Sequence, residues 1–159
     1  MYTILMLTEE ALSGHDVTRV AQLHGDERVS VHLLVPADTE HNSLIEALDE
    51  VALGRLREAL DDSDDATPQQ AEQDAMHAVN ASIEALRAAG IESRGSVTGD
   101  DPVPAAIEAV KQFDVDEVIV VTPPHPVKEA LHRDWSSRLR DKVDVPLLHF
   151  VAGTDRVVS

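Results

Sequence analysis

The amino-acid sequence predicts a single α/β domain built on a doubly wound sheet of five parallel strands. Short apolar runs alternate with segments of helical periodicity along all 159 residues, a length that fits one domain. The clearest unit spans residues 97–125, where a Gly-Asp-Asp-Pro turn leads into an Ala-rich helical pattern and then into the apolar run 118–121. A strand, a capped helix and a buried strand in this order form a βαβ unit, which crosses over right-handed in a parallel sheet.

The first third of the chain predicts two strands joined by a short helix. Residues 2–7 are apolar and predict a buried first strand. After a loop, His15 and Asp16 are expected to cap a short helix, which Gly25 would end. Residues 29–35 form the next apolar run and the predicted second strand.

Two capping boxes mark helices in the middle of the chain. Ser-Leu-Ile-Glu at 43–46 predicts a helix to about residue 60, and Thr-Pro-Gln-Gln at 67–70 predicts a second helix that Gly90 would end. Between them, residues 61–67 form an acidic stretch that lacks the Gly and the distal Glu of a calcium loop. We therefore interpret 61–67 as a solvated linker inside the domain.

In residues 91–97, Ile, Ser, Gly and Val alternate with the more polar Glu, Arg and Ser, which favours an exposed edge strand over a central one. The next helix is expected to begin at Pro102, because Asp100 and Asp101 before it are good caps and proline suits the first helical position. This explanation competes with a role for the two aspartates as paired carboxylates. The helix should end near Phe113.

The last third of the chain predicts a helix and a final strand. Apolar residues recur at every fourth position through 126–143, and a break in the helix is expected near Asp134. Trp135 in this segment is predicted to lie in the core or on a dimer surface. Residues 147–152 form the last apolar strand.

Composition limits the possible functions. The formal net charge of −17 argues against nucleic acid or an anionic membrane surface as a partner, because those are bound through clustered Lys and Arg. The apolar runs are much shorter than the roughly 20 residues of a membrane-spanning helix, so we expect a cytoplasmic protein without a membrane partner. The chain has no cysteine and no His-x3-His or His-Glu-x2-His pattern, and no metal site is expected.

Four features in this order resemble the universal stress protein family. They are the apolar strand 4–7, the Val97-x-Gly99-Asp100-x-Pro102 turn, the run Asp116-Glu117-Val118-Ile119-Val120-Val121, and the ending Leu139-Arg140-x3-Asp144-Val145-Pro146-Leu147-Leu148. The resemblance implies a Rossmann-like fold of the adenine nucleotide alpha hydrolase type, with strand order 3-2-1-4-5. It also implies a homodimer through the last strand, with the interface residues Leu147, Leu148, His149, Phe150 and Val151.

The implied strand order places a crevice beyond the carboxyl ends of strands 1 and 4, where the order reverses. The candidate ligand-binding residues at this crevice are Thr8, Glu9, Gly99, Asp100, Thr122, His125, Arg133 and Ser136. His125 could bind an anion or donate a proton with Arg133 as its charge partner. Alternatively, His125 or Asp134 is an N-cap at an exposed helix entrance.

ATP-binding members of the family carry a Gly-x2-Gly-x9-Gly-Ser/Thr pattern after strand 4. This chain has Thr-Pro-Pro-His-Pro at 122–126, and its prolines remove N–H donors where a phosphate would need them. Glu9 and Glu10 would also repel the phosphates. Depending on the register, the final Gly-Ser position falls on Trp135-Ser136 or on Arg133-Asp134. We interpret the ATP site as lost and expect no cofactor.

Three hypotheses of function follow. The first is a non-catalytic module of the stress response that homodimerises and binds a protein partner or a small ligand. The alternative is a nucleotide- or anion-binding protein that uses Thr122, Arg133 and Ser136 in place of the glycine loop. The third is a small hydrolase or transferase. The fold cannot decide among them, because function depends on the site.

Overall fold

The computed structural model describes residues 1–37, 68–99, 101–124, 126–154 and 157, with only the backbone described at 68 and 126–132. Five parallel strands form one sheet in the order β3-β2-β1-β4-β5, as predicted. They are β1 (Tyr2–Thr8), β2 (Val29–Pro36), β3 (Glu92–Thr98), β4 (Glu117–Thr122) and β5 (Leu147–Val151). The predicted helix at 43–60, the linker at 61–67, Asp100 and His125 lie outside the described residues.

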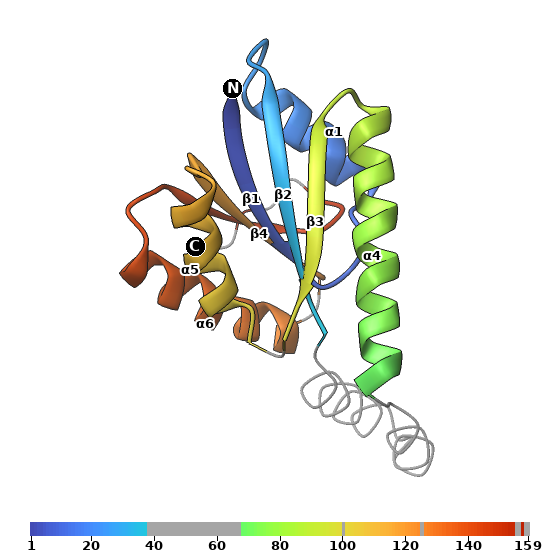
Figure 1. Cartoon of the computed structure of the whole chain (residues 1–159), viewed down its shortest axis with the longest axis vertical. Coiled ribbons are helices and arrows are strands. Elements are labelled where there is room, and N and C mark those ends of the chain that lie inside the picture. Colours follow the sequence, from blue (N-terminus) through green and yellow to red (C-terminus); the bar gives the residue numbers. More distant parts are fainter. Residues whose placement is uncertain (38–67, 100, 125, 155–156, 158–159) are drawn as a thin grey trace.

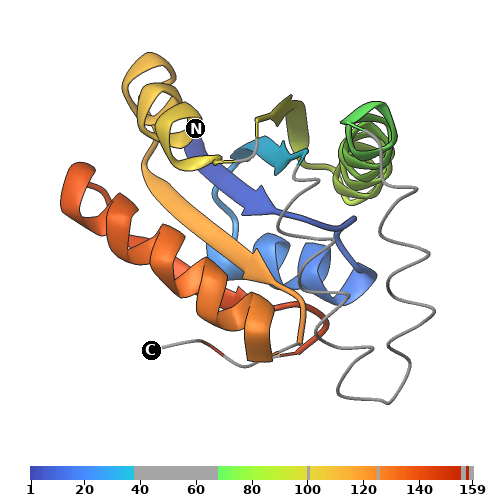
Figure 2. The same cartoon turned by 90° about the horizontal axis from the view of Figure 1, so that it is seen from below.

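Four described helices cover the two faces of the sheet: α1 (Gly14–Leu23), α4 (Pro68–Ala88), α5 (Val103–Gln112) and α6 (Pro126–Lys142). Figure 2 shows α1 and α4 on one side of the strands and α5 and α6 on the other. Side chains alternate between the faces along each strand, so Ile4 and Met6 join the core under α1 and α4. Leu5 and Leu7 join the second core, under α5 and α6.

Local sequence signals explain most element boundaries. Gly90 adopts φ = 79° after α4, a conformation that costs glycine little, and its N–H donates to the Arg87 carbonyl. Gly95 in β3 lies against α4: a Cβ atom there would meet Val79 Cγ1 and the Leu33 carbonyl oxygen at 3.0 Å. The close approach of strand and helix therefore accounts for this glycine.

The N-termini of α1 and α5 differ from the prediction. Ser13, not Asp16, is the N-cap of α1, and its hydroxyl accepts from the Asp16 N–H. Asp16 completes a capping box from the third helical position. Helix α5 begins at Val103, one residue later than predicted, and the Val103 N–H donates to Asp101 Oδ1.

Helix α6 is continuous, so the predicted break near Asp134 is wrong. Asp134 is exposed, and its carboxylate lies 3.7 Å from Arg138 Nη1 one turn later, an (i, i+4) pair that favours the helix. Trp135 and Leu139 are buried against the sheet. The core alternative for Trp135 is therefore the one that the structure supports.

His32 in β2 predicts a pH dependence of stability. His32 is 9% exposed, and its ring stacks on Phe113 with 4.0 Å between ring centroids. Burial and the nearby Arg94 guanidinium lower the pKa of His32 below its ordinary value of 6.5. The unfolded chain then binds more protons than the folded chain at weakly acidic pH, so this contribution to stability is present above pH 6.5 and is lost as the pH falls through the folded pKa.

We therefore expect the free energy of unfolding to fall between about pH 7.5 and about pH 5.5, and to fall less in His32→Phe. Urea denaturation at the two pH values measures this difference. His77→Gln is the matched control, because it removes an imidazole from an exposed position on α4. An equal decline in wild type and His32→Phe would contradict the prediction.

Candidate functional site

The sheet places a candidate site at the carboxyl ends of β1 and β4. Thr8 pairs with Val121 in the register between these strands, so Thr8 and Thr122 end adjacent strands at the same edge. The strand order reverses between β1 and β4, and the helices that follow them cover opposite faces. This arrangement leaves a crevice in open α/β sheets.

Both threonine hydroxyls at this edge are buried and bonded within the chain. Thr8 is 2% exposed, and its Oγ1 donates to the Glu10 carbonyl at 2.9 Å. Thr122 is fully buried, and its Oγ1 donates to the Pro123 carbonyl at 3.4 Å. In this structure both hydroxyl protons are used in hydrogen bonds within the chain.

The loop after β1 is acidic and is held against α4. The Leu12 N–H donates to Ser82 Oγ at 3.0 Å, and Ser82 is fully buried. Both carboxylate oxygens of Glu9 are buried in this loop, whereas Glu10 is exposed. Glu9 directly follows Thr8 at this edge, and an ionised carboxylate there would oppose a phosphate group.

The segment after β4 offers few backbone donors. Pro123 is buried, Pro124 is exposed, and α6 begins at Pro126, so three of the residues here have no N–H. A glycine loop binds phosphate through successive backbone N–H groups. The described part of this segment lacks that arrangement.

Two predicted residues on α6 lie in different surroundings. Arg133 is exposed on the outer part of the helix. Ser136 is 1% exposed, and its Oγ lies 3.4 Å from Nδ1 of His149, which is also 1% exposed in β5. His149 pairs with Val120, which lies two residues before Thr122 in β4. Ser136 therefore lies in the core next to this strand pair, and not at the strand ends.

Gly99 lies at the same edge, but at its far side. It is exposed and follows β3, which is separated from β1 by β2. Two strand spacings put it about 10 Å from Thr8 across the sheet. Of the predicted residues, the structure therefore brings Thr8, Glu9 and Thr122 together, with Gly99 farther along the edge.

Arg138 is a charged residue at this side of the molecule that the sequence did not indicate. Its Nη1 and Nη2 donate to the two carboxylate oxygens of Asp101 at 3.2 and 2.6 Å, joining α6 to the loop before α5. These hydrogen bonds lower the pKa of Asp101 and raise that of Arg138. Both side chains are more than 40% exposed, so solvent weakens the pair.

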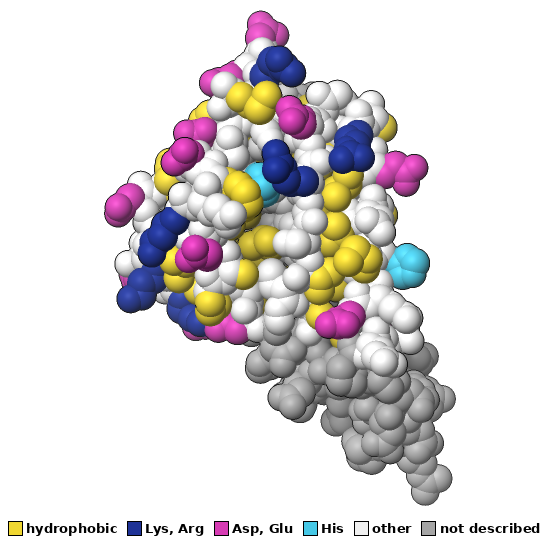
Figure 3. Space-filling model, in the orientation of Figure 1, with side chains coloured by type: hydrophobic (Ala, Val, Ile, Leu, Met, Phe, Trp, Pro, Cys, Tyr) yellow, Lys and Arg dark blue, Asp and Glu magenta, His cyan; other side chains and the backbone are white. Residues whose placement is uncertain are grey.

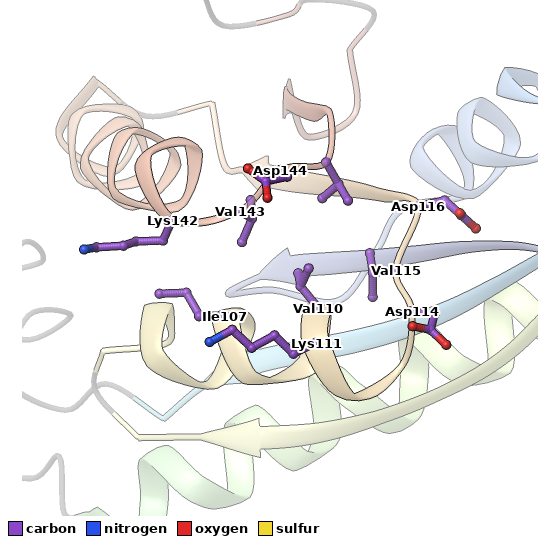
Figure 4. Close-up of a pocket in the computed structure, with 10 residues that line it drawn as sticks. Ile107, Val110, Lys111, Asp114, Val115, Asp116, Lys142, Val143 and Asp144 are labelled. Atoms are coloured by element: carbon purple, nitrogen blue, oxygen red, sulfur yellow. The ribbon is translucent and has the colours of Figure 1, made fainter.

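A hollow of about 420 Å³ lies at the opposite end of the sheet, between the last turns of α5 and α6 (Figure 4). Lys111 and Lys142 carry their nitrogen atoms on one side of it, and Asp114 and Asp116 lie on the other. Apolar side chains form the wall between them: Ile107, Val110, Val115, Val143 and Val145.

Three of these four charges have structural explanations. The two lysines lie in last helical turns, where a cation offsets the helix dipole. Asp116 Oδ2 accepts from the Thr3 N–H at 2.8 Å. We therefore rank this hollow below the strand-end crevice as a functional site.

Three further observations concern the surface charge, the metal ligands and membrane-spanning helices. On the face shown in Figure 3, Lys and Arg side chains lie among acidic ones and do not form one continuous patch. Within the part of the chain that the structure describes, no three His, Asp or Glu side chains are placed to bind a metal ion. None of the described helices is long and apolar enough to cross a membrane.

A scan against protein-family models gave no match, and a sequence search of curated proteins gave none either. Solved structures, however, are similar over nearly the whole chain. A universal stress protein from Archaeoglobus fulgidus in complex with dAMP aligns with TM-score 0.54 and 12% identity, covering 96% of this chain and 98% of its own. A second structure of a universal stress protein from that organism gives TM-score 0.52 at 11% identity, covering 96% and 94%.

A universal stress protein family protein from Arabidopsis thaliana with AMP bound aligns with TM-score 0.54 and 10% identity, covering 96% of this chain and 94% of its own. At such identities the likeness concerns the fold. The chain therefore has the universal stress protein fold, with the strand order that the resemblance implied.

Proposed function

From the universal stress protein fold as the premise, we propose that this chain is a non-catalytic module of the stress response without a working ATP site. It acts by self-association and by binding a protein partner or a small ligand. The observation that carries the loss of ATP binding is the segment after β4, where Pro123, Pro124 and Pro126 remove N–H donors. The buried Thr8 and Thr122 hydroxyls and the Glu9 carboxylate add to the argument.

The bound dAMP and AMP in two structural neighbours favour nucleotide binding as the second candidate. In this chain it would rely on Arg133, because Ser136 faces His149 and the Thr122 hydroxyl donates to the chain itself. A single exposed guanidinium would have to replace a set of converging donors, and its charge would be screened by solvent.

A melting experiment with ATP or AMP, with and without Mg²⁺, separates the two candidates. At nucleotide concentrations of about 100 times Kd, binding would add about 2.7 kcal/mol of stability. For a chain of this size, that would raise Tm by roughly 5 to 10 °C. We expect no change in Tm at millimolar nucleotide.

Arg133→Ala identifies the residue responsible if Tm does rise. If nucleotide raises Tm in the wild type but not in Arg133→Ala, the chain binds nucleotide through Arg133. That result would support the second candidate and contradict the proposal. Arg140→Ala is the matched control, because Arg140 is exposed on the same helix and belongs to neither candidate site.

A further inference from the structure

The hollow between the last turns of α5 and α6 has the size and the lining of a small-molecule site. Its volume of about 420 Å³ lies within the range of roughly 300 to 1,000 Å³ that is usual for ligand pockets. Of the apolar side chains in its wall, Val115 is buried and the others are half-buried, so the hollow is apolar and opens to solvent. Such a lining favours a ligand with an apolar body.

Opposite charges lie on the two sides of this hollow. Figure 4 shows the nitrogen atoms of Lys111 and Lys142 on one side and the carboxylates of Asp114 and Asp116 on the other. The two lysines belong to different helices, and among the described residues neither has an ion-pair partner. The helix dipoles explain why each lysine lies in a last turn, but they do not explain why both ammonium groups lie on one side of the same hollow.

The acidic side of the hollow favours a cation. Asp114 follows the C-cap Phe113 and has φ = 49°, a left-handed conformation that aspartate tolerates. Its carboxylate lies next to the C-terminal end of α5, whose dipole also favours positive charge. Asp144 is a further lining residue, so the hollow has three aspartates and two lysines and no excess of positive charge. A simple anion is therefore not the ligand that these charges favour.

We propose that this hollow binds a short apolar peptide with free ends, whose carboxylate lies at Lys111 and Lys142 and whose ammonium group lies at Asp114 and Asp116. The inference rests on the small-ligand part of the proposed function, and it gives that ligand a site and a chemical class. The apolar side chains of the peptide pack on the valines of the wall, and its amide groups stay hydrated on the open side. Exposed ion pairs contribute little individually, so binding needs both ends and the apolar contact.

Isothermal titration calorimetry with the tripeptide Val-Leu-Val, and with its N-acetylated and C-amidated forms, tests the requirement for both ends. We expect saturable binding of the free tripeptide with a Kd of about 1 mM or lower. Removal of either end charge should weaken binding about fivefold, which corresponds to the loss of one exposed ion pair. No binding of the free tripeptide, or equal affinity for all three peptides, would overturn the inference.

Variants of the chain test where the peptide binds. The double variant Lys111→Gln, Lys142→Gln should bind the free tripeptide about fivefold more weakly, with its affinity for the amidated peptide unchanged. Asp114→Asn should weaken binding of the free tripeptide but not of the N-acetylated one, and asparagine also tolerates the left-handed backbone. Arg140→Gln is the matched control, because Arg140 is exposed on α6 and does not line the hollow.

Circular dichroism verifies that each variant is folded. Unchanged affinity for the free tripeptide in both lining variants would place the peptide elsewhere and overturn the site. The nucleotide experiment has a separate outcome, because the hollow and the strand-end crevice lie at opposite ends of the sheet. A rise in Tm with ATP or AMP would contradict the loss of the ATP site, whereas absent peptide binding without such a rise would overturn the peptide site alone.

Discussion

Replacing Asp16 with alanine is expected to lower the free energy of unfolding by about 3 kcal/mol. The Asp16 side chain is 5% exposed and accepts three hydrogen bonds: from the Ser13 N–H at 3.0 Å, from Ser13 Oγ at 2.8 Å and from the Gly153 N–H at 2.8 Å. Alanine would lose the capping box and leave the Gly153 N–H without its acceptor. Urea denaturation at neutral pH measures the loss.

Asp16→Asn is the control for shape. Its amide oxygen can still accept one of these bonds, so we expect a loss of about 1 kcal/mol. Equal losses in the two variants would mean that a single amide oxygen cannot replace the two carboxylate oxygens at this position. A loss below about 0.5 kcal/mol in Asp16→Ala would contradict the structural role given to this residue.

The second large effect is expected at Glu117, where alanine should also lower the free energy of unfolding by about 3 kcal/mol. Glu117 is a carboxylate at the start of β4 and is only 5% exposed. Its Oε2 lies 2.9 Å from Nε2 of His24, the residue that caps the end of α1. Removing the carboxylate leaves His24 without this partner and opens a cavity beside β1.

Tyr2 gives a separate readout of the Glu117 charge, because it is the only tyrosine in the chain and its ring packs on His24 with 4.0 Å between centroids. Burial raises the pKa of Tyr2, and the carboxylates of Glu117, Asp116 and Glu27 raise it further. Glu117→Gln should therefore lower the pH at which tyrosine absorbance changes. Glu27→Gln should have a smaller effect, and an unchanged titration in Glu117→Gln would contradict this electrostatic account.

The raised pKa of Tyr2 also has a consequence for stability. Because the folded pKa is higher than the unfolded one, the folded chain holds this proton more tightly. The contribution is complete below about pH 10 and is lost as the pH rises through the folded pKa.

Periodicity and end signals were enough to predict an α/β sheet of five strands, because four strands are apolar runs and β3 has the alternating pattern of an edge strand. The strand order came from the family resemblance. The errors arose where two signals competed. Ser13 and Asp16 have the spacing of a capping box, but the prediction gave the cap to the carboxylate itself. The prediction also placed a break near Asp134, whereas Asp134 is exposed within a continuous helix and pairs with Arg138.

The candidate site was predictable only at the level of the backbone. The ends of β1 and β4 followed from the strand order, but the directions of the Thr8 and Thr122 hydroxyls depend on hydrogen bonds that no sequence pattern specifies. Pairs such as Asp101 with Arg138, 37 residues apart, and His24 with Glu117, 93 residues apart, arise from tertiary packing. Isolated charged residues give no sign of such partners.

We propose that a universal stress protein fold is combined here with a strand-end crevice that does not bind a nucleotide phosphate. Mass spectrometry of the small molecules released when the purified protein is denatured tests this claim most directly. The account predicts no stoichiometric AMP, ADP or ATP. About one nucleotide released per chain would contradict it.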